Sequence, residues 1–162
     1  MPWTLRLLTL ALLASLAACG DYPRDPDGTL ERVRGGTMRV GVIHDPPFVI
    51  AGGDAPRGRE ADLARSYART LGARIAWRHA GAGTLMRQLE ERRLDAVIGG
   101  HVADSPWAAH VSFSRPYRIR DDAGRLVRRR VALPPGENAW QVAFERHAAS
   151  LAARATLAGG GE

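Results

Sequence analysis

The chain has 162 residues, of which 45% are hydrophobic and 25% charged, which is typical of one globular domain with a modest core and too short for two full α/β lobes. Its formal net charge is +6, and all 23 of its Lys and Arg residues are arginines. Because these arginines are not gathered with aromatic residues in a stripe or a known motif, we predict no nucleic-acid partner.

The amino terminus has the pattern of a bacterial export signal. Arg6 supplies a positive charge, and residues 7–16 form an apolar run of about ten residues, half the length that a membrane-spanning helix needs. Small residues then precede Cys19, the only cysteine, as in the lipobox of bacterial lipoproteins. We predict a lipoprotein signal peptide over residues 1–18 and a Cys19 that carries acyl chains such as palmitate. The alternative, a secretory signal followed by a free thiol, is unusual in a secreted chain.

Acylation anchors a protein stably, so we expect the mature chain on the periplasmic side of a bacterial membrane. Gly20, in place of an aspartate after the cysteine, favours the outer membrane. Residues 19–36 are rich in Pro, Gly, Asp and Arg, which predicts a lipidated flexible tether with a short helical turn at residues 30–33. A single cysteine also means no disulfide within the domain.

From residue 37 the hydrophobic pattern alternates between strands and helices. Strands are predicted over residues 38–43, 73–78 and 94–98, and helices over residues 60–71 and from a Thr84 cap through Leu89. This order predicts parallel βαβ units. The later residues 118–120 and 126–133 predict a hairpin, and residues 137–154 predict a helix that ends the domain near residue 156.

Four stretches carry a family resemblance: MRVGVIHDPPF, GREADLARSYARTLGARIAW, LEERRLDAVIGG and VSFSRPY. In this order they resemble the amino-terminal lobe of periplasmic solute-binding proteins of the amino-acid type, family three, over residues 37–117. In that family two lobes close on a small ligand, which is handed to an ABC importer. The resemblance implies an α/β fold consisting of a single lobe over residues 37–156, with a central, mainly parallel sheet flanked by helices. The second lobe is replaced by the hairpin.

The loops after the first and third strands should meet at the carboxyl edge of the sheet, where open α/β sheets bind ligands. The predicted ligand-binding residues are His44, Asp45, Phe48, Gly99, Gly100, His101 and Trp107. In amino-acid-binding members an arginine, six residues before the Phe of the FS motif, holds the ligand carboxylate. That position is Trp107 in this chain, which makes the usual mode of amino-acid binding doubtful.

Other chemistries have weaker support. A divalent metal could be held by four loop residues, His44, Asp45, His101 and Asp104, but their spacing in the sequence is not that of a known metal motif. The alternative is that they are solvated loop residues, with Asp104 or Ser105 capping a turn. We therefore predict no metal and no cofactor. Enzyme motifs such as GxSxG, HExxH and a phosphate loop are absent, so we predict no enzyme. Residues 128–130, three arginines, could attract anionic lipids but are better explained as a solvated strand edge.

Two functions remain. The first is a membrane-anchored, extracytoplasmic solute-binding protein, an ABC-transporter component or a relative of one, that takes a small polar solute alone or as an oligomer. The second is a ligand-free interaction module that docks on a permease or another envelope complex. The first predicts a concave polar groove at the carboxyl edge; the second predicts an exposed apolar patch there, anchored by Phe48 and Trp107.

Overall fold

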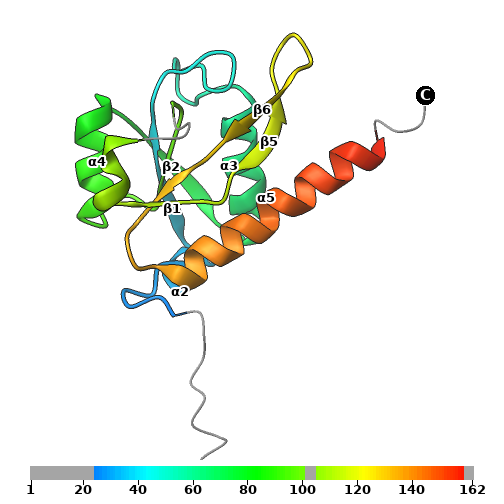
Figure 1. Ribbon diagram of the computed structural model, residues 1–162. Coiled ribbons are helices and arrows are strands. Elements are labelled where there is room, and N and C mark those ends of the chain that lie inside the picture. Colours follow the sequence, from blue (N-terminus) through cyan, green and yellow to red (C-terminus); the bar gives the residue numbers. More distant parts are fainter. Residues whose placement is uncertain (1–23, 101–104, 159–162) are drawn as a thin grey trace, which may run out of the picture.

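A five-stranded sheet lies at the centre of the computed structural model, which describes residues 24–100 and 105–158 (Figure 1). In spatial order its strands are β2 (Arg74–His79), β1 (Thr37–Val42), β3 (Ala96–Ile98), β7 (Ala132–Leu133) and β4 (Ser112–Phe113). β1 pairs in parallel with β2 and β3, whereas β7 is antiparallel to β3 and β4. The predicted α/β fold with a central, mainly parallel sheet is therefore confirmed, and the antiparallel pairing of β7 makes the sheet mixed.

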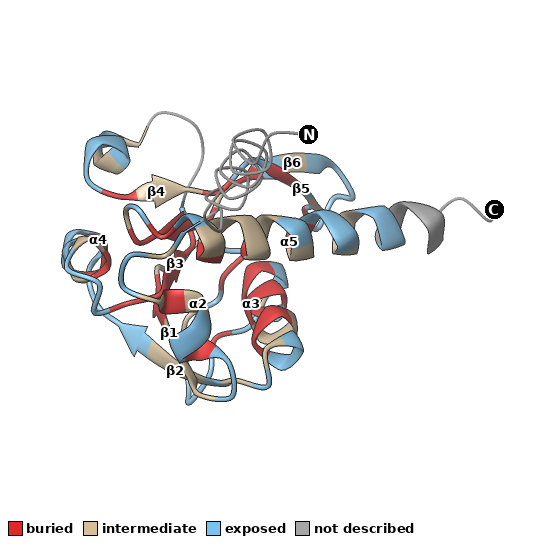
Figure 2. Ribbon diagram, turned by 90° about the horizontal axis from the view of Figure 1, so that it is seen from below, coloured by how far each residue is buried: buried red, intermediate tan, exposed pale blue. Residues whose placement is uncertain are grey.

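Helices cover both faces of this sheet. On one face lie α2 (Thr29–Val33), α3 (Arg59–Thr70) and α5 (Asn138–Ala158), and on the other lies α4 (Ala82–Glu90). Figure 2 shows the buried side of α3 turned toward the sheet and exposed residues along much of α5. Among the described helices, none is long and apolar enough to cross a bilayer.

The alternation of side chains along the strands produces this division. Met38, Val40 and Val42 of β1 belong to the core cluster with α3 and α5, whereas Val97 of β3 belongs to the cluster with α4. Residues with opposite parity point to opposite faces of a strand, so a strand buried on both faces needs apolar residues at nearly every position. This is why a continuous apolar run, rather than an alternating one, predicts β3.

α4 begins earlier than its sequence indicates. Its N-cap is Gly81, whose carbonyl accepts hydrogen bonds from Thr84 N (3.0 Å) and Leu85 N (3.1 Å), with no side-chain cap. The prediction that Thr84 caps this helix is therefore wrong. A hydroxyl residue can occupy the first turn as well as the cap, and the sequence alone does not separate the two.

The predicted returning strand over residues 126–133 divides into two elements. β6 (Leu126–Arg129) pairs with β5 (Tyr117–Arg120) in a two-stranded hairpin, while β7 joins the central sheet. Between them, Val131 N donates to Ser114 Oγ (3.0 Å) and Val131 O accepts from Ser114 N (2.9 Å). Val131, Ala132 and Leu133 are fully buried, and the burial of these apolar side chains in the core favours a separate strand in the central sheet over a longer hairpin.

Residues 24–36 are part of this lobe, so the predicted start at residue 37 is too late. Glu137 accepts hydrogen bonds from the backbone N–H groups of Asp27 (3.0 Å) and Thr29 (2.9 Å) at the start of α2. Asp25 in turn accepts from Trp140 N (2.9 Å) in the first turn of α5. The two helix starts thus satisfy each other's free N–H groups. The predicted signal peptide, Cys19 and residues 19–23 of the tether lie outside the described residues.

Trp140 joins α5 to the centre of the lobe. Its side chain is fully buried, its indole N–H donates to the carbonyl of Asp95 (2.8 Å), and its ring centre lies 5.1 Å from that of Tyr67. We expect Trp140→Ala to lower the free energy of unfolding by about 3–5 kcal/mol, as for other buried aromatic residues. Urea denaturation measures this, with Leu126→Ala, a truncation at a side chain 56% exposed, as the control. Equal losses in the two variants would contradict the packing described here.

Candidate functional site

The loops that follow β1 and β3 lie side by side at the carboxyl edge of the sheet, as the sequence predicts. Ile43 N donates to Ile98 O (3.0 Å), which extends the pairing of the two strands to their ends. Beyond this point the carboxylate of Asp45 accepts a hydrogen bond from Gly100 N (2.8 Å). The edge is therefore closed by a contact between a side chain of one loop and the backbone of the other.

Glu60, in the first turn of α3, lies beneath these loops and is fully buried. One carboxylate oxygen accepts from Gly99 N (2.8 Å), and the other accepts from the Tyr117 hydroxyl (3.0 Å) and from Arg129 Nε (2.8 Å). A buried carboxylate is tolerated only when it is paired and hydrogen-bonded, and Glu60 meets both conditions. The sequence analysis does not single out this residue.

Arg129 of β6 completes the cluster. Only 4% of its side chain is exposed; it forms ion pairs with both Glu60 and Asp45, and its guanidinium carbon lies 4.4 Å from the ring centre of Phe48. The interpretation of residues 128–130 as a solvated edge is therefore wrong for Arg129. In the hairpin, Arg129 is opposite Tyr117 and shares the inward face of β6 with Val127, whereas Arg128 is exposed. The period of two along β6 was the signal that could have found it.

This cluster, Asp45, Glu60, Tyr117 and Arg129, is called the edge network below. Burial, reinforced by the charge of Glu60 and the hydrogen bond to it, raises the pKa of Tyr117 and keeps the phenol neutral. Burial by itself would lower the pKa of Arg129, but hydrogen bonds and charges from Glu60 and Asp45 outweigh it and raise the pKa. Two carboxylates thus face one guanidinium, and Asp45, with 28% of its side chain exposed, brings the excess acidic group to the surface.

The predicted ligand-binding residues divide into several groups. Asp45, Phe48, Gly99 and Gly100 come together, although the 8% exposure of Phe48 rules it out as an exposed anchor. Gly99 has φ +95°, and a Cβ there would lie 2.2 Å from Ile43 O, so only glycine fits. His44 is exposed, and its Nδ1 accepts from Ala51 N (3.1 Å).

Trp107 stands apart from this group. Trp107 lies in the short 3₁₀ helix η1 (Pro106–Ala109) and packs, half-buried, against the core cluster on the α4 side. Ser105 Oγ accepts from Trp107 N (3.3 Å), which confirms the alternative of a capped turn before Pro106. His101 and Asp104 lie outside the described residues. Among the residues that are described, no three His, Cys, Asp or Glu side chains gather where they could hold a metal ion.

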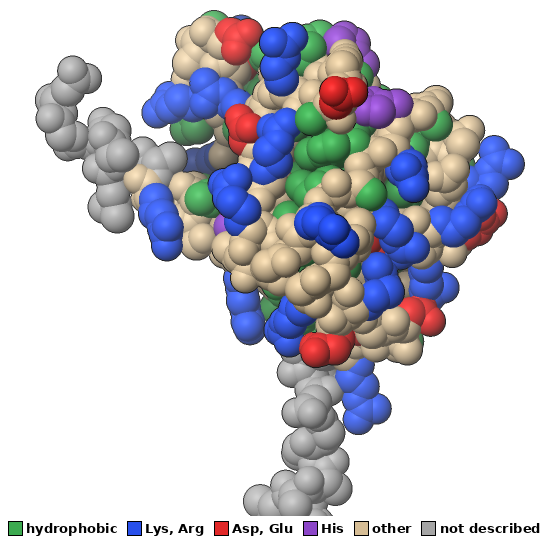
Figure 3. All heavy atoms as spheres, turned by 180° about the vertical axis from the view of Figure 1, so that it is seen from behind, with side chains coloured by type: hydrophobic (Ala, Val, Ile, Leu, Met, Phe, Trp, Pro, Cys, Tyr) green, Lys and Arg blue, Asp and Glu red, His purple; other side chains and the backbone are tan. Residues whose placement is uncertain are grey.

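Arginine side chains do not collect in one patch on the face seen in Figure 3; they are dispersed between apolar and neutral surface. The positive net charge of the chain is thus spread over this face. At the carboxyl edge, by contrast, carboxylates outnumber the guanidinium. Among the described residues, the edge network therefore carries two formal negative charges and one positive charge, whereas the chain as a whole is positively charged.

Residues 38–159 match the family described as bacterial extracellular solute-binding proteins, family 3. The chain belongs to this family. The arginine-bound form of domain 1 from TmArgBP superposes with a TM-score of 0.62 at 23% identity, covering 74% of this chain and 97% of that one. The ancestral amino-acid-binding protein AncCDT-1 gives 0.64 at 15% identity, covering 79% and 95%. These likenesses show the fold, which is that of one lobe.

Two further relatives are more similar in sequence over shorter stretches. EhuB in complex with hydroxyectoine gives a TM-score of 0.50 at 28% identity, covering 59% of this chain and 38% of that one. Membrane-bound lytic murein transglycosylase F of Vibrio cholerae is 31% identical over 98 residues, which is 59% of this chain and 18% of the relative. The chain therefore matches less than a fifth of that longer protein. The family and the solved structures that resemble this chain are mainly binding proteins.

Removing the charge of Arg129 should destabilise the lobe strongly. We expect Arg129→Gln to lower the free energy of unfolding by about 3–5 kcal/mol, because it leaves two carboxylates at the edge without their cation. The neighbouring variant Arg128→Gln changes an exposed arginine and should cost less than about 0.5 kcal/mol. Chemical denaturation of both variants measures the difference. Similar small losses would mean that the edge network does not stabilise the fold.

The free energy of unfolding should depend on pH through the titration of His147 in α5. Its Nε2 lies 2.6 Å from Ser66 Oγ, and burial, followed by the charges of Arg154 and Arg69, lowers its pKa. Since the unfolded chain binds the proton more readily, the stabilisation is complete above the unfolded value of about 6.5 and is lost as the pH falls below it. Between pH 7 and pH 5, wild type should lose more unfolding free energy than His147→Gln. Parallel curves from urea denaturation at each pH would refute this.

Proposed function

We propose that the chain is a membrane-anchored, extracytoplasmic solute-binding protein that takes a small polar solute at the carboxyl edge of its sheet and serves an ABC importer or a related uptake system. Its membership of a family of extracellular solute-binding proteins supports this role. The lipoprotein signal expected at Cys19 supplies the anchor. With one lobe, the solute is held either on an open edge or between two copies of the chain.

The edge network supports a choice of solute chemistry. The donors that would hold a carboxylate at this edge, Gly99 N, Gly100 N and Arg129, are bonded to the protein's own carboxylates. Among the described residues of the two loops, the side chains left to a ligand are the partly exposed carboxylate of Asp45 and the exposed imidazole of His44. The carboxylate of Asp45 attracts a positive charge and repels a negative one. We therefore propose a solute with a cationic nitrogen group. The hydroxyectoine bound by EhuB is a zwitterion that carries such a cationic group beside a carboxylate.

The same observation supports a second candidate, a ligand-free module that docks on a permease or another envelope complex. At this edge the backbone N–H groups of Gly99 and Gly100 already have hydrogen-bond partners within the protein, as expected of a structural contact and not of a free binding site. The similarity to a segment of a much longer murein transglycosylase is consistent with a lobe that works beside other domains. The two candidates differ in whether any free solute stabilises the chain.

A thermal-shift screen separates them. The solutes are arginine, lysine, putrescine and hydroxyectoine, compared with glutarate, neutral sugars and divalent metals. At a hundredfold excess over its dissociation constant, a bound cationic solute should add about 2.7 kcal/mol to the free energy of unfolding, a readily measured rise in Tm. Asp45→Asn should weaken this binding about tenfold, because one charge-assisted contact is lost.

The matched control is Asp62→Asn, which alters an exposed carboxylate of α3 that is paired with Arg65 (2.8 Å). It should leave the affinity unchanged. Trp107→Ala tests the predicted contribution of Trp107, which packs toward α4. If a cationic solute raises Tm and Asp45→Asn reduces the added stability by about half at the same solute concentration, the receptor function is supported. A screen in which no solute raises Tm would exclude it for the isolated chain and favour the interaction module.

A further inference from the structure

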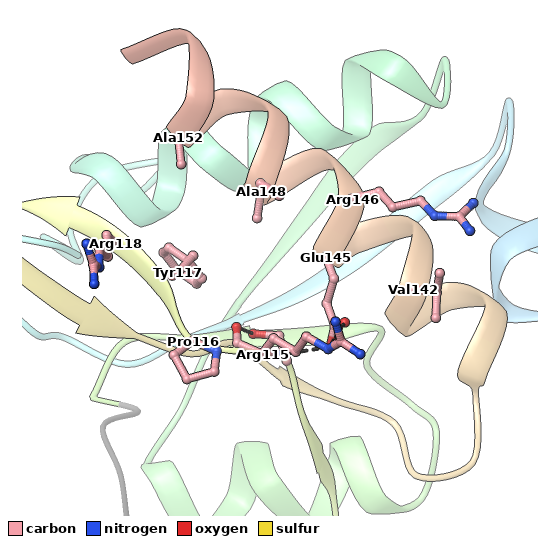
Figure 4. Close-up of a pocket in the computed structure, with 11 residues that line it drawn as sticks. Arg115, Pro116, Tyr117, Arg118, Val142, Glu145, Arg146, Ala148 and Ala152 are labelled. Atoms are coloured by element: carbon pink, nitrogen blue, oxygen red, sulfur yellow. Dashed lines mark hydrogen bonds and ion pairs between the residues drawn. The ribbon is translucent and has the colours of Figure 1, made fainter. Parts of the chain in front are cut away.

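A hollow of about 680 Å³ lies between α5 and the segment that leads into β5, away from the carboxyl edge (Figure 4). Its apolar wall consists of Pro116, the ring of Tyr117 and four residues of α5, namely Val142, Ala148, Ala149 and Ala152. In the close-up, Tyr117 on β5 faces α5 across the space. A smaller hollow of 220 Å³ adjoins it and shares Tyr117, Arg118, Ala148 and Ala152.

Small side chains on α5 leave this space open. Ala148 and Ala152 are one helical turn apart and therefore stand on the same face of the helix. The Tyr117 hydroxyl is directed to Glu60, so the edge network fixes one wall of the hollow. A volume of this size falls within the range of small-molecule sites, roughly 300–1,000 Å³.

Charge at the rim indicates which molecules fit. Three arginines line the hollow, Arg115, Arg118 and Arg146, against a single carboxylate, Glu145. Glu145 is already engaged: it accepts from Arg115 N (2.8 Å) and its second oxygen lies 3.5 Å from Arg115 Nε. Among the described residues, Arg118 and Arg146 have no ion-pair partner, and Figure 4 places them at opposite ends of the hollow.

The like charges on β5 and β6 support the same conclusion. Arg118 is directly opposite Arg128 in the hairpin, and both are exposed. Like charges directly opposite one another destabilise a hairpin, and an anion bound beside them relieves the repulsion. Guanidinium groups bind carboxylates in a two-pronged geometry that adds specificity to the attraction.

We propose that this hollow is a second binding site, for an organic anion with an apolar body and a carboxylate group. The apolar body lies against Tyr117 and the alanines of α5, and the carboxylate is held by Arg118 or Arg146 at the rim. This site is separate from the carboxyl edge and has the opposite charge preference. The chain would thus bind two classes of molecule at two places.

Calorimetric titration of the purified protein tests this, with 2-naphthoate and decanedioate as anionic probes and 2-naphthylmethylamine as the cationic counterpart of the same size. The carboxylates should bind, and the amine should bind at least tenfold more weakly. Arg118→Gln and Arg146→Gln should together weaken 2-naphthoate about tenfold or more, the loss expected for charge-assisted hydrogen bonds. Ala152→Leu should block binding by filling the hollow.

Arg74→Gln is the control, since it removes an exposed arginine of β2, the strand at the far edge of the sheet. It should leave the affinity for 2-naphthoate unchanged, and the rim variants should have a Tm no lower than that of the wild type, because they alter exposed side chains and Arg118→Gln removes a like-charge pair. Equal binding of naphthoate and its amine counterpart, or naphthoate binding that survives the double rim substitution, would overturn the proposal. So would the failure of both carboxylates to bind. None of these results depends on the solute screen at the carboxyl edge.

Discussion

The buried carboxylate of Glu60 is the group on which the rest of this lobe depends. It joins four segments that are distant in the sequence: the start of α3, the loop after β3 through Gly99 N, the first strand of the hairpin through the Tyr117 hydroxyl, and the second through Arg129. A buried carboxylate without partners would cost several kcal/mol, so the fold must supply all of them at once. Losing any one of these partners should therefore lower the free energy of unfolding strongly, because Glu60 would stay buried without it.

The contacts of Glu60 explain how a short hairpin is stable at the position where a two-lobed relative continues into its second lobe. An isolated two-stranded hairpin is marginally stable in water, and β5 and β6 have only four residues each. Tyr117 and Arg129, paired across the hairpin, both reach Glu60, and Arg129 also covers Phe48. The hairpin is thus held at its base by the sheet. The same contacts occupy the donors of the carboxyl edge, so the stability of the single lobe and the solute preference proposed for it depend on the same groups.

α5 has a comparable double role. Its first turn exchanges caps with α2, and Trp140 and Phe144 fill the core against Tyr67. Further along, Ala148, Ala149 and Ala152 line the hollow with the arginine rim, and their small side chains leave it open. One helix therefore provides dense packing at its start and an open concave surface in its middle. A large residue at Ala148 or Ala152 would extend the packing and remove the hollow.

The sequence by itself determined the three parallel strands β1, β2 and β3, the presence of the helices α3 and α4 between them, the family and the place where the loops of β1 and β3 meet, because hydrophobic period and glycine position are local properties of the chain. It also placed Asp45, Gly99 and Gly100 at that edge. Tertiary structure decided the rest. The hydrogen bonds of Glu60 to Tyr117 and Arg129 join residues 57 and 69 positions apart, and the bond from Asp27 to Glu137 spans 110. The alternation along β6 can mark Arg129 as inward-facing, but contacts at such separations leave no local pattern that identifies its partners, Glu60 and Asp45.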